Sequence, residues 1–220
     1  MSVNTSAYQQ LVKQLSGDQV TLVAVSKIKP VSDIKALYDL GQRDFGENYV
    51  QELVDKQSQL PADIRWHFIG HLQSNKVKYI APFVHLIHGV DSFNLLKEIN
   101  KQALKNNRII DCLLQVHVAQ EETKFGLNEK ELNEILTQVA VLENVQIKGL
   151  MGMASFSDDE TRVRSEFRQL KRLFIQLGQP EILNLKPEIL SMGMSGDYAM
   201  AIEEGSTMVR VGSLLFGARV

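Results

Sequence analysis

Short apolar runs alternate with amphipathic segments along the whole chain. The apolar runs end at glycine, proline or polar residues, and several are rich in β-branched residues, which is typical of parallel strands buried on both faces. Apolar residues spaced three or four apart predict helices between these runs. The predicted strands lie at about residues 20–25, 44–46, 66–69, 84–90, 112–118, 145–151, 189–192 and 208–211.

Several helix boundaries follow from capping residues. An apolar stripe predicts an opening helix at about residues 5–16 that closes at Gly17. A later helix begins at Asn128, which has Glu131 three residues further on and so forms a variant of the capping box. Asn48 stands in a similar place before another helix. It is interpreted as a helix cap, a ligand contact or both, with the cap as the simpler interpretation.

Regular alternation of strands and helices with short connections predicts a parallel sheet. Eight strand-helix units in 220 residues favour closure of that sheet into a TIM-like (β/α)8 barrel, and a doubly wound open sheet is the alternative architecture. No linker rich in Pro, Gly or Ser divides the chain. We therefore expect residues 1–220 to form one α/β domain that begins with the helix at about 5–16.

Composition and charge exclude several classes of protein. The formal net charge is -2, and the 24 basic and 26 acidic residues are interspersed, which argues against a nucleic-acid partner. No run approaches the ~20 apolar residues needed to span a bilayer, and no basic and apolar leader begins the chain, so we expect a cytoplasmic protein. The single cysteine, Cys112, lies in an apolar run and is expected to be a buried core thiol.

A lysine stands at the carboxyl end of the first predicted strand. The run 20–25 leads directly into Ser26 and Lys27 and stops at Pro30. Ligands bind at this end of the strands in α/β barrels, and a partly desolvated ammonium there can lose its proton and attack a carbonyl carbon. Lys27 is therefore a candidate imine-forming residue, with a solvated lysine in a strand-to-helix loop as the alternative.

Two late turns have the character of a phosphate site. The segment 193–197 contains Ser195, and Gly212 with Ser213 follows the last strand. The loops after strands seven and eight of such barrels commonly hold phosphate on backbone N–H groups and hydroxyls. One Gly-Ser turn is an ordinary feature, but here two such turns occur at the two expected places.

An amine nucleophile combined with an anion site predicts a pocket for a phosphorylated aldehyde. Pyridoxal 5'-phosphate (PLP) is the first candidate, and a sugar phosphate also fits. From the eighth strand, Arg210 could donate a hydrogen bond to a heterocycle nitrogen, which favours PLP, although a surface ion pair is its alternative role. His67, inside an aromatic strand, is interpreted as a hydrogen-bonded core group, and the five histidines show no spacing that supports a metal site.

Five segments of the chain resemble the pyridoxal phosphate homeostasis proteins. They are residues 23–30, 45–52, 66–76, 148–151 and 191–217, in that order. The resemblance implies a single barrel similar to the N-terminal domain of alanine racemase, of PLP fold type III, with PLP held as a Schiff base on Lys27. It further implies the remaining cofactor-binding residues, namely Ser195 with Gly212 and Ser213 at the phosphate, Arg210 at the pyridine nitrogen and Asn48 beside the ring.

The resemblance also implies a role in intracellular PLP, vitamin B6 and amino-acid homeostasis, without an assigned catalytic turnover. Arg210 favours such a carrier, because a guanidinium can only donate to the ring nitrogen and so weakens the ring as an electron sink. A second domain that would supply a further base is not expected, which also suggests a monomer. A weak PLP-dependent amino-acid racemase is the second hypothesis, and a Schiff-base sugar-phosphate aldolase is the third.

Two further expectations concern partners. PLP-dependent apoenzymes are possible recipients of the cofactor. Lys29, Lys76 and Lys124 lie in or near predicted loops at the strand ends and are candidates for a secondary PLP site. Solvated loop lysines are the simpler interpretation of all three.

Overall fold

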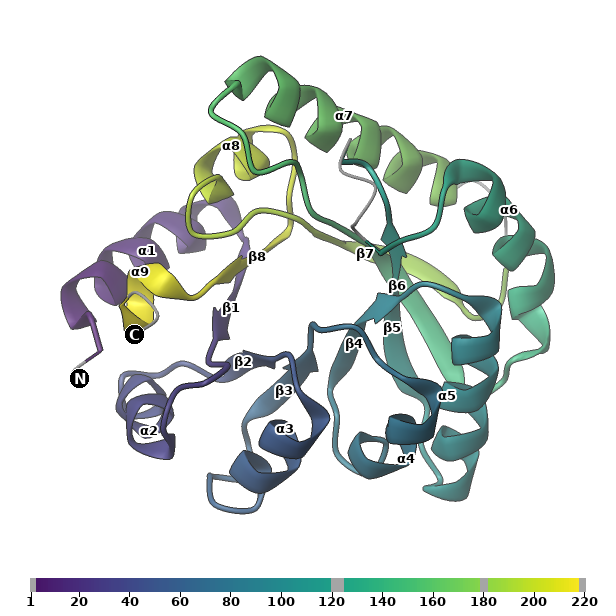
Figure 1. The fold of residues 1–220 in the computed structure, drawn as a ribbon, viewed down its shortest axis with the longest axis horizontal. Coiled ribbons are helices and arrows are strands. Elements are labelled where there is room, and N and C mark those ends of the chain that lie inside the picture. Colours follow the sequence, from purple (N-terminus) through teal and green to yellow (C-terminus); the bar gives the residue numbers. More distant parts are fainter. Residues whose placement is uncertain (1–2, 120–124, 179–181, 218–220) are drawn as a thin grey trace.

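Eight parallel strands close into a barrel in the order of the chain, β1-β2-β3-β4-β5-β6-β7-β8. The computed structural model describes residues 3–119, 125–178 and 182–217. The strands form a ring and the helices lie around its outside (Figure 1). The predicted (β/α)8 barrel is confirmed, and the open sheet is wrong. The strands are β1 (Thr21–Val25), β2 (Asp44–Glu47), β3 (Arg65–Phe68), β4 (Leu86–Val90), β5 (Ile110–Val116), β6 (Val145–Gly152), β7 (Leu185–Ser191) and β8 (Met208–Val211).

Helices connect successive strands, as the apolar spacing predicts. The connection between β3 and β4 is a 3-10 turn, η1 (Ser74–Lys76), followed by a single helical turn, and a second 3-10 turn, η2 (Val139–Val141), precedes β6. The helices are α1 (Thr5–Asp18), α2 (Val31–Asp39), α3 (Val50–Gln57), α4 (Val77–Ile80), α5 (Phe93–Lys105), α6 (Glu129–Gln138), α7 (Glu160–Leu177), α8 (Tyr198–Glu203) and α9 (Ser213–Phe216). The short helix α9, which the sequence patterns did not predict, lies against α1 and accepts the Asn4 N–H at the Leu215 carbonyl oxygen (2.8 Å).

Side chains alternate between two cores along each strand. In β1, Leu22 and Ala24 belong to the large core between the barrel and its helices. Val23 points the other way and packs with Leu86, Leu113, Met151 and Met208 in a small core inside the barrel. Polar side chains fill much of the remaining interior, and they determine the chemistry of the site.

Some predicted boundaries are wrong for local reasons. β7 begins at Leu185, four residues before the predicted Ile189, because the polar residues and Pro187 at its start conceal the strand pattern. On the β6 side, Pro187 lies between the paired residues Leu185 and Ile189, where the register shifts. On the β8 side, β7 pairs at Ser191, so the missing N–H falls outside both ladders. Gly17 lies inside α1, which ends at Asp18 with Gln19 in the left-handed conformation.

The two predicted caps have different outcomes. Asn128 caps α6 and forms the full capping box with Glu131, as predicted. Asn48 does not cap α3, so that interpretation is wrong. The cap position belongs to Tyr49, which makes no side-chain cap hydrogen bond, and the Asn48 side chain is left for another role.

Cys112 is fully buried in the core outside the barrel, where burial raises the pKa of its thiol well above the ordinary value. This confirms the expected core thiol. None of the helices in the described parts of the chain is long and apolar enough to cross a bilayer.

Candidate functional site

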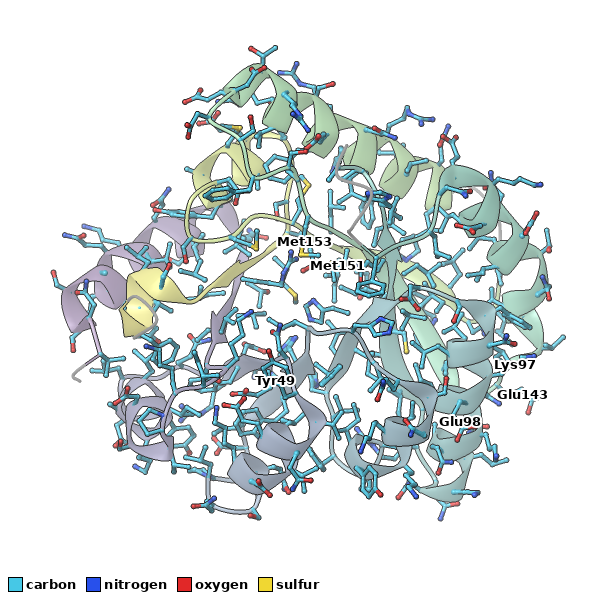
Figure 2. All side chains as sticks on the ribbon, in the orientation of Figure 1. Tyr49, Lys97, Glu98, Glu143, Met151 and Met153 are labelled. Atoms are coloured by element: carbon cyan, nitrogen blue, oxygen red, sulfur yellow. The ribbon has the colours of Figure 1, made fainter. Side chains whose placement is uncertain are left out.

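A cavity of about 770 Å³ opens at the carboxyl ends of the strands. All six residues predicted to bind the cofactor line it, and they come from the ends of β1, β2, β7 and β8. Met153, after β6, forms part of the apolar wall, and Figure 2 places Met151 and Met153 toward the middle of the ring of strands. The predicted site residues that meet in this cavity are Lys27, Asn48, Ser195, Arg210, Gly212 and Ser213.

Lys27 lies two residues after β1, in a loop with an unusual backbone. The next residue, Ile28, has φ of 59°, a left-handed conformation that β-branched side chains rarely adopt. Its N–H donates to Glu52 Oε1 at 2.5 Å. The loop is therefore held in a strained shape by a side chain from α3, and this shape directs Lys27 to the cavity.

A buried ion cluster fixes the other side of the same loop. Lys56 Nζ donates to the Ser26 carbonyl oxygen (2.7 Å), to Glu47 Oε1 (2.7 Å) and to Glu52 Oε1 (2.6 Å). Ser26 Oγ donates to Glu47 Oε1 at 2.6 Å. Glu47 is fully buried, and burial raises the pKa of its carboxyl while Lys56 opposes that rise. We call Ser26, Glu47, Glu52 and Lys56 the loop clamp.

The loop clamp is not among the features predicted from the sequence. A signal was present, because Glu52 and Lys56 stand four residues apart and therefore share one face of α3. Glu47 closes a strand that is buried at every position, where a carboxylate needs a partner. No sequence pattern indicates that this partner also holds Ser26.

The turns after β7 and β8 meet at the cavity. The Gly212 N–H donates to Ser195 Oγ at 3.2 Å. Asp197 Oδ1 accepts the Met194 N–H at 2.6 Å and so shapes the turn that carries Ser195. A Cβ atom at Gly212 would lie 3.3 Å from both Cβ and the carbonyl oxygen of Val25, which leaves little space for a side chain. The predicted anion site is thus a compact group of small donors.

Arg210 is buried, so its alternative role as a surface ion pair is wrong. Only 4% of the residue is exposed. Nη1 donates to Ser191 Oγ at 2.7 Å and Nη2 donates to the Gly152 carbonyl oxygen at 3.1 Å. Burial lowers the pKa of the guanidinium to about 10, so it remains a cation and a donor at neutral pH.

Asn48 lines the cavity and has an acceptor in its side chain that is unpaired within the described part of the chain. Its Oδ1 atom is buried and has no hydrogen-bond partner among the described residues. A buried carbonyl oxygen without a partner costs roughly 1–3 kcal/mol, so this side chain is destabilising where it stands beside the cavity.

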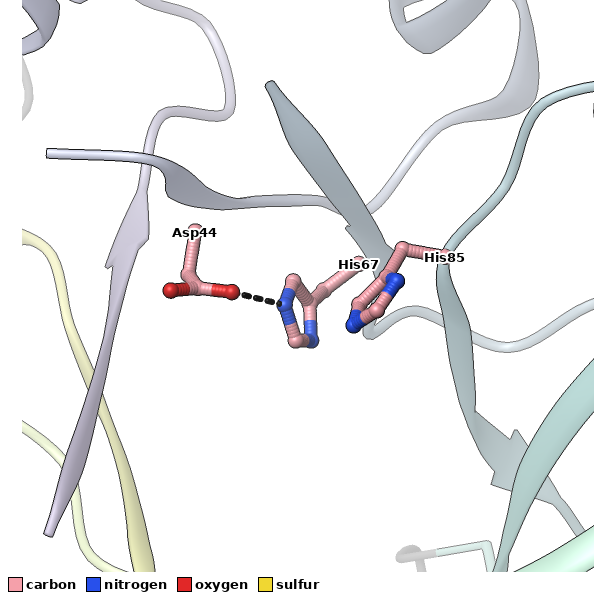
Figure 3. A group of neighbouring side chains, drawn as sticks. All are labelled: Asp44, His67 and His85. Atoms are coloured by element: carbon pink, nitrogen blue, oxygen red, sulfur yellow. Dashed lines mark hydrogen bonds and ion pairs between the residues drawn. The ribbon is translucent and has the colours of Figure 1, made fainter. Parts of the chain in front are cut away.

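One group of side chains in the described residues has the composition of a metal site, although none was predicted. Donor atoms of Asp44, His67 and His85 lie within 4.8 Å of one another (Figure 3). The Asp44 carboxylate already accepts Arg65 Nε at 2.7 Å and Nη2 on its other oxygen, as well as His67 Nε2 at 3.0 Å. A cation would lie beside this guanidinium, so we assign the group to hydrogen bonding. The expectation that His67 is a hydrogen-bonded core group is confirmed.

The loop lysines have different surroundings. Lys29 lines the cavity, and its Nζ donates to the Phe216 carbonyl oxygen at 2.9 Å. Lys76 Nζ lies 5.8 Å from the centre of the Tyr79 ring. Lys124 falls outside the described residues.

Comparison with known proteins identifies the family. Residues 4–220 match the family model for the N-terminal domain of alanine racemase. The pyridoxal phosphate homeostasis protein of Aquifex aeolicus is 44% identical over 199 residues, covering 90% of this chain and 86% of that protein. The one from Escherichia coli is 39% identical over 210 residues, covering 93% and 88%. The chain belongs to the pyridoxal phosphate homeostasis protein family.

Solved structures agree with this membership. The structure of PipY from Synechococcus elongatus with PLP bound has 37% sequence identity and a TM-score of 0.88, and the match covers 96% of this chain and 99% of that chain. Alanine racemase from Bartonella henselae, with covalently bound pyridoxal phosphate, has a TM-score of 0.70 at 17% identity, and the match covers 97% and 59%. The racemase shares the fold alone. The resemblance drawn from five sequence segments is confirmed.

Proposed function

We propose that this member of the family binds PLP as a Schiff base on Lys27 and takes part in PLP, vitamin B6 and amino-acid homeostasis. The main support is the convergence of an amine, an anion site and a guanidinium on one cavity. A second support is Asn48, which lines the cavity and whose buried Oδ1 atom has no hydrogen-bond partner among the described residues. PipY, which covers nearly the same length and was solved with PLP bound, supports the choice of ligand.

The cavity residues have separate roles in this proposal. Lys27 would hold the cofactor covalently through its amine. Ser195, Gly212 and Ser213 would hold the phosphate, and Arg210 would donate to the ring nitrogen. Asn48 lies beside the ring. When bound, the cofactor would supply an electrophilic carbon and a conjugated ring.

The same guanidinium supports a carrier rather than an efficient enzyme. A strong electron sink requires a protonated ring nitrogen, which a carboxylate partner stabilises. Arg210 has only donors to offer, so it favours the unprotonated nitrogen. We propose that catalytic turnover is not the function, that PLP-dependent apoenzymes are the recipients of the cofactor and that the protein is a monomer.

Mapping the covalent adduct tests the cofactor and the residue together. We expect purified protein with PLP to absorb in the visible, and borohydride reduction to leave the pyridoxyl mass on the peptide containing Lys27. Lys27→Ala should lose both signals. Lys29→Ala is the matched control, since Lys29 lines the same cavity, and it should keep them. A pyridoxyl mass on another lysine with Lys27 unmodified would refute the assignment.

Turnover is tested separately from binding. The PLP-loaded protein is incubated with L-amino acids in deuterated water and the α-hydrogen is followed by mass spectrometry. A carrier should leave the α-position unlabelled. Deuteration that disappears in Lys27→Ala would instead identify a racemase-like enzyme.

A further inference from the structure

A column of buried polar side chains crosses the interior of the barrel from the start of β2 to the cavity. Its members come from five strands and are at most 7% exposed. Of these five residues, Arg210 is the one that lines the cavity. We call this group the polar column: Asp44 on β2, His67 on β3, His88 on β4, Ser191 on β7 and Arg210 on β8.

Consecutive members of the polar column are joined by hydrogen bonds. Arg210 Nη1 donates to Ser191 Oγ at 2.7 Å, and Ser191 Oγ lies 3.2 Å from His88 Nδ1. His88 Nε2 lies 2.9 Å from His67 Nδ1, and His67 Nε2 lies 3.0 Å from Asp44 Oδ1. Four contacts therefore connect the guanidinium in the cavity with a carboxylate at the opposite end of the barrel.

The two ends of the polar column determine its direction. A guanidinium can only donate, so Ser191 Oγ accepts at the cavity end. At the other end, burial raises the pKa of Asp44, but hydrogen bonds from Arg65 and His67 outweigh burial and lower it to about 2. The Asp44 carboxylate is therefore ionised at neutral pH and can only accept, which requires a proton on His67 Nε2.

One tautomer of both histidines then satisfies every contact of the polar column. With its proton on Nε2 and none on Nδ1, His67 accepts at Nδ1 from His88 Nε2–H. His88 then accepts at Nδ1 from the Ser191 hydroxyl. Burial lowers the pKa of His88 well below its ordinary value, which supports a neutral ring. Each donor consequently points from Arg210 toward Asp44, and each member of the polar column has a partner on both sides.

We propose that the polar column positions the Arg210 guanidinium for the cofactor, with Ser191, His88 and His67 as positioning residues and Asp44 as the acceptor that ends the chain of hydrogen bonds. This proposal rests on the proposed function, in which Arg210 faces the ring nitrogen. The guanidinium donates to a hydroxyl and a backbone carbonyl, and the carboxylate that acts on its charge is Asp197, which lines the same cavity. The polar column fixes the orientation of the Ser191 hydroxyl that accepts from Arg210. Changes three links from the cavity therefore alter the binding of PLP.

A metal ion bound by Asp44, His67 and His85 is the competing explanation for these side chains. His85 distinguishes the metal site from the polar column. Its ring lies edge to face with the His67 ring, with 5.4 Å between the ring centres, and it is not a member of the polar column. A metal site needs His85, whereas the polar column does not.

The first test uses the protein without PLP and reads the tautomers directly. Nitrogen-15 NMR of the histidine side chains at pH 7.5 should show His67 and His88 neutral, each protonated at Nε2. Assignment uses His67→Phe and His88→Phe. A proton on Nδ1 of either ring, or a charged ring, would overturn the proposed direction of the polar column.

The second test measures PLP affinity and the visible spectrum in matched variants. Ser191→Ala should weaken PLP binding about tenfold and shift the absorbance maximum, since Arg210 loses a charge-assisted hydrogen bond. Ser206→Ala is its control, because Ser206 is an equally buried hydroxyl that donates to carbonyl oxygens of β7 and β8 and to that of Met192. The control should bind PLP as the wild type does.

A variant remote from the cavity separates positioning from simple stability. His67→Phe should weaken PLP binding about threefold and shift the spectrum in the same direction as Ser191→Ala. His85→Phe should change neither. In the double variant Ser191→Ala/His67→Phe, affinity should fall no further than in Ser191→Ala alone, whereas independent sites would multiply to about thirtyfold.

The outcomes also separate this proposal from the proposed function. If the wild type fails to bind PLP while the tautomers are as expected, the proposed function fails and the direction of the polar column stands. If PLP binds but His67→Phe leaves both affinity and spectrum unchanged, the positioning role is refuted. Equal effects of His67→Phe and His85→Phe, with metal found in the wild type, would favour the metal site. If His67→Phe does not fold, Ser191→Ala and the tautomer measurement decide.

Discussion

Replacing Lys56 with Met tests whether the loop clamp supports the loop that carries Lys27. Lys56 contacts three oxygen atoms within 2.7 Å, and the Glu47 side chain beside it has no exposed surface. Met keeps the bulk of the aliphatic stem and removes the charge, which leaves a buried carboxylate uncompensated. Breaking a buried ion pair in this way costs about 3–5 kcal/mol.

The dependence of this cost on pH is the sharper part of the prediction. Burial already raises the pKa of Glu47, and loss of Lys56 raises it further. A carboxyl with a raised pKa in the folded state stabilises the protein below its unfolded pKa, and this stability is lost as pH rises through the folded pKa. Lys56→Met should therefore be most destabilising at pH 8 and less so near pH 5.

Urea denaturation followed by circular dichroism at the two pH values measures the effect. Lys35→Met is the matched control, because Lys35 also pairs with a carboxylate four residues away on a helix but is about half exposed. Such a surface pair contributes about 0.3–0.5 kcal/mol. If Lys56→Met costs no more than Lys35→Met, or if its cost is the same at pH 5 and pH 8, the reasoning is wrong.

Three further predictions concern single positions. Gly212→Ala should weaken binding of PLP about tenfold, because the added methyl group crowds Val25 and the anion site. Pyridoxal, which lacks the phosphate, should bind as in the wild type, and the same absorbance titration measures both ligands. Asp44→Asn should remove about 2–3 kcal/mol of stability at pH 7 but little near pH 2. A carboxyl whose pKa is lowered in the folded state stabilises the protein above its unfolded pKa, and this stability is lost as pH falls through the folded pKa. Urea denaturation midpoints at both pH values check this. Ile28→Asn should raise the melting temperature, since Asn tolerates a φ of 59° better than a β-branched residue; an unchanged or lower value would contradict the assigned strain.

The periodic part of the fold was accessible from the sequence because its cause is local. Continuous apolar runs and amphipathic spacing correspond directly to the strands and their helices, and the capping box at Asn128 needs only Glu131 beside it. Predicted strand and helix boundaries were wrong where contacts with distant segments decide them. Pro187 is acceptable in β7 because of how the neighbouring strand pairs, and no local pattern contains that information.

The candidate site was predictable in its positions and not in its connections. Strand ends supplied Lys27, Arg210 and the two turns, since a barrel brings all carboxyl ends to one rim. The partners of Arg210 were not accessible, because Ser191 and His88 come from strands that approach only after closure. The interpretation of Asn48 as a cap failed for the same reason, because only the folded structure shows that its Oδ1 atom has no hydrogen-bond partner among the described residues.

The polar column also has a consequence for how the chain folds. Each member lies on a different strand, and sliding any of these strands by one residue would turn its polar group toward the apolar helix layer. A misregistered barrel would then bury a carboxylate, an imidazole or a guanidinium without its partner, at a cost far above that of a displaced valine. An interior filled only with aliphatic side chains would penalise such slips weakly. We expect the polar column to destabilise barrels with the wrong strand register and so to favour one closed barrel over the alternatives.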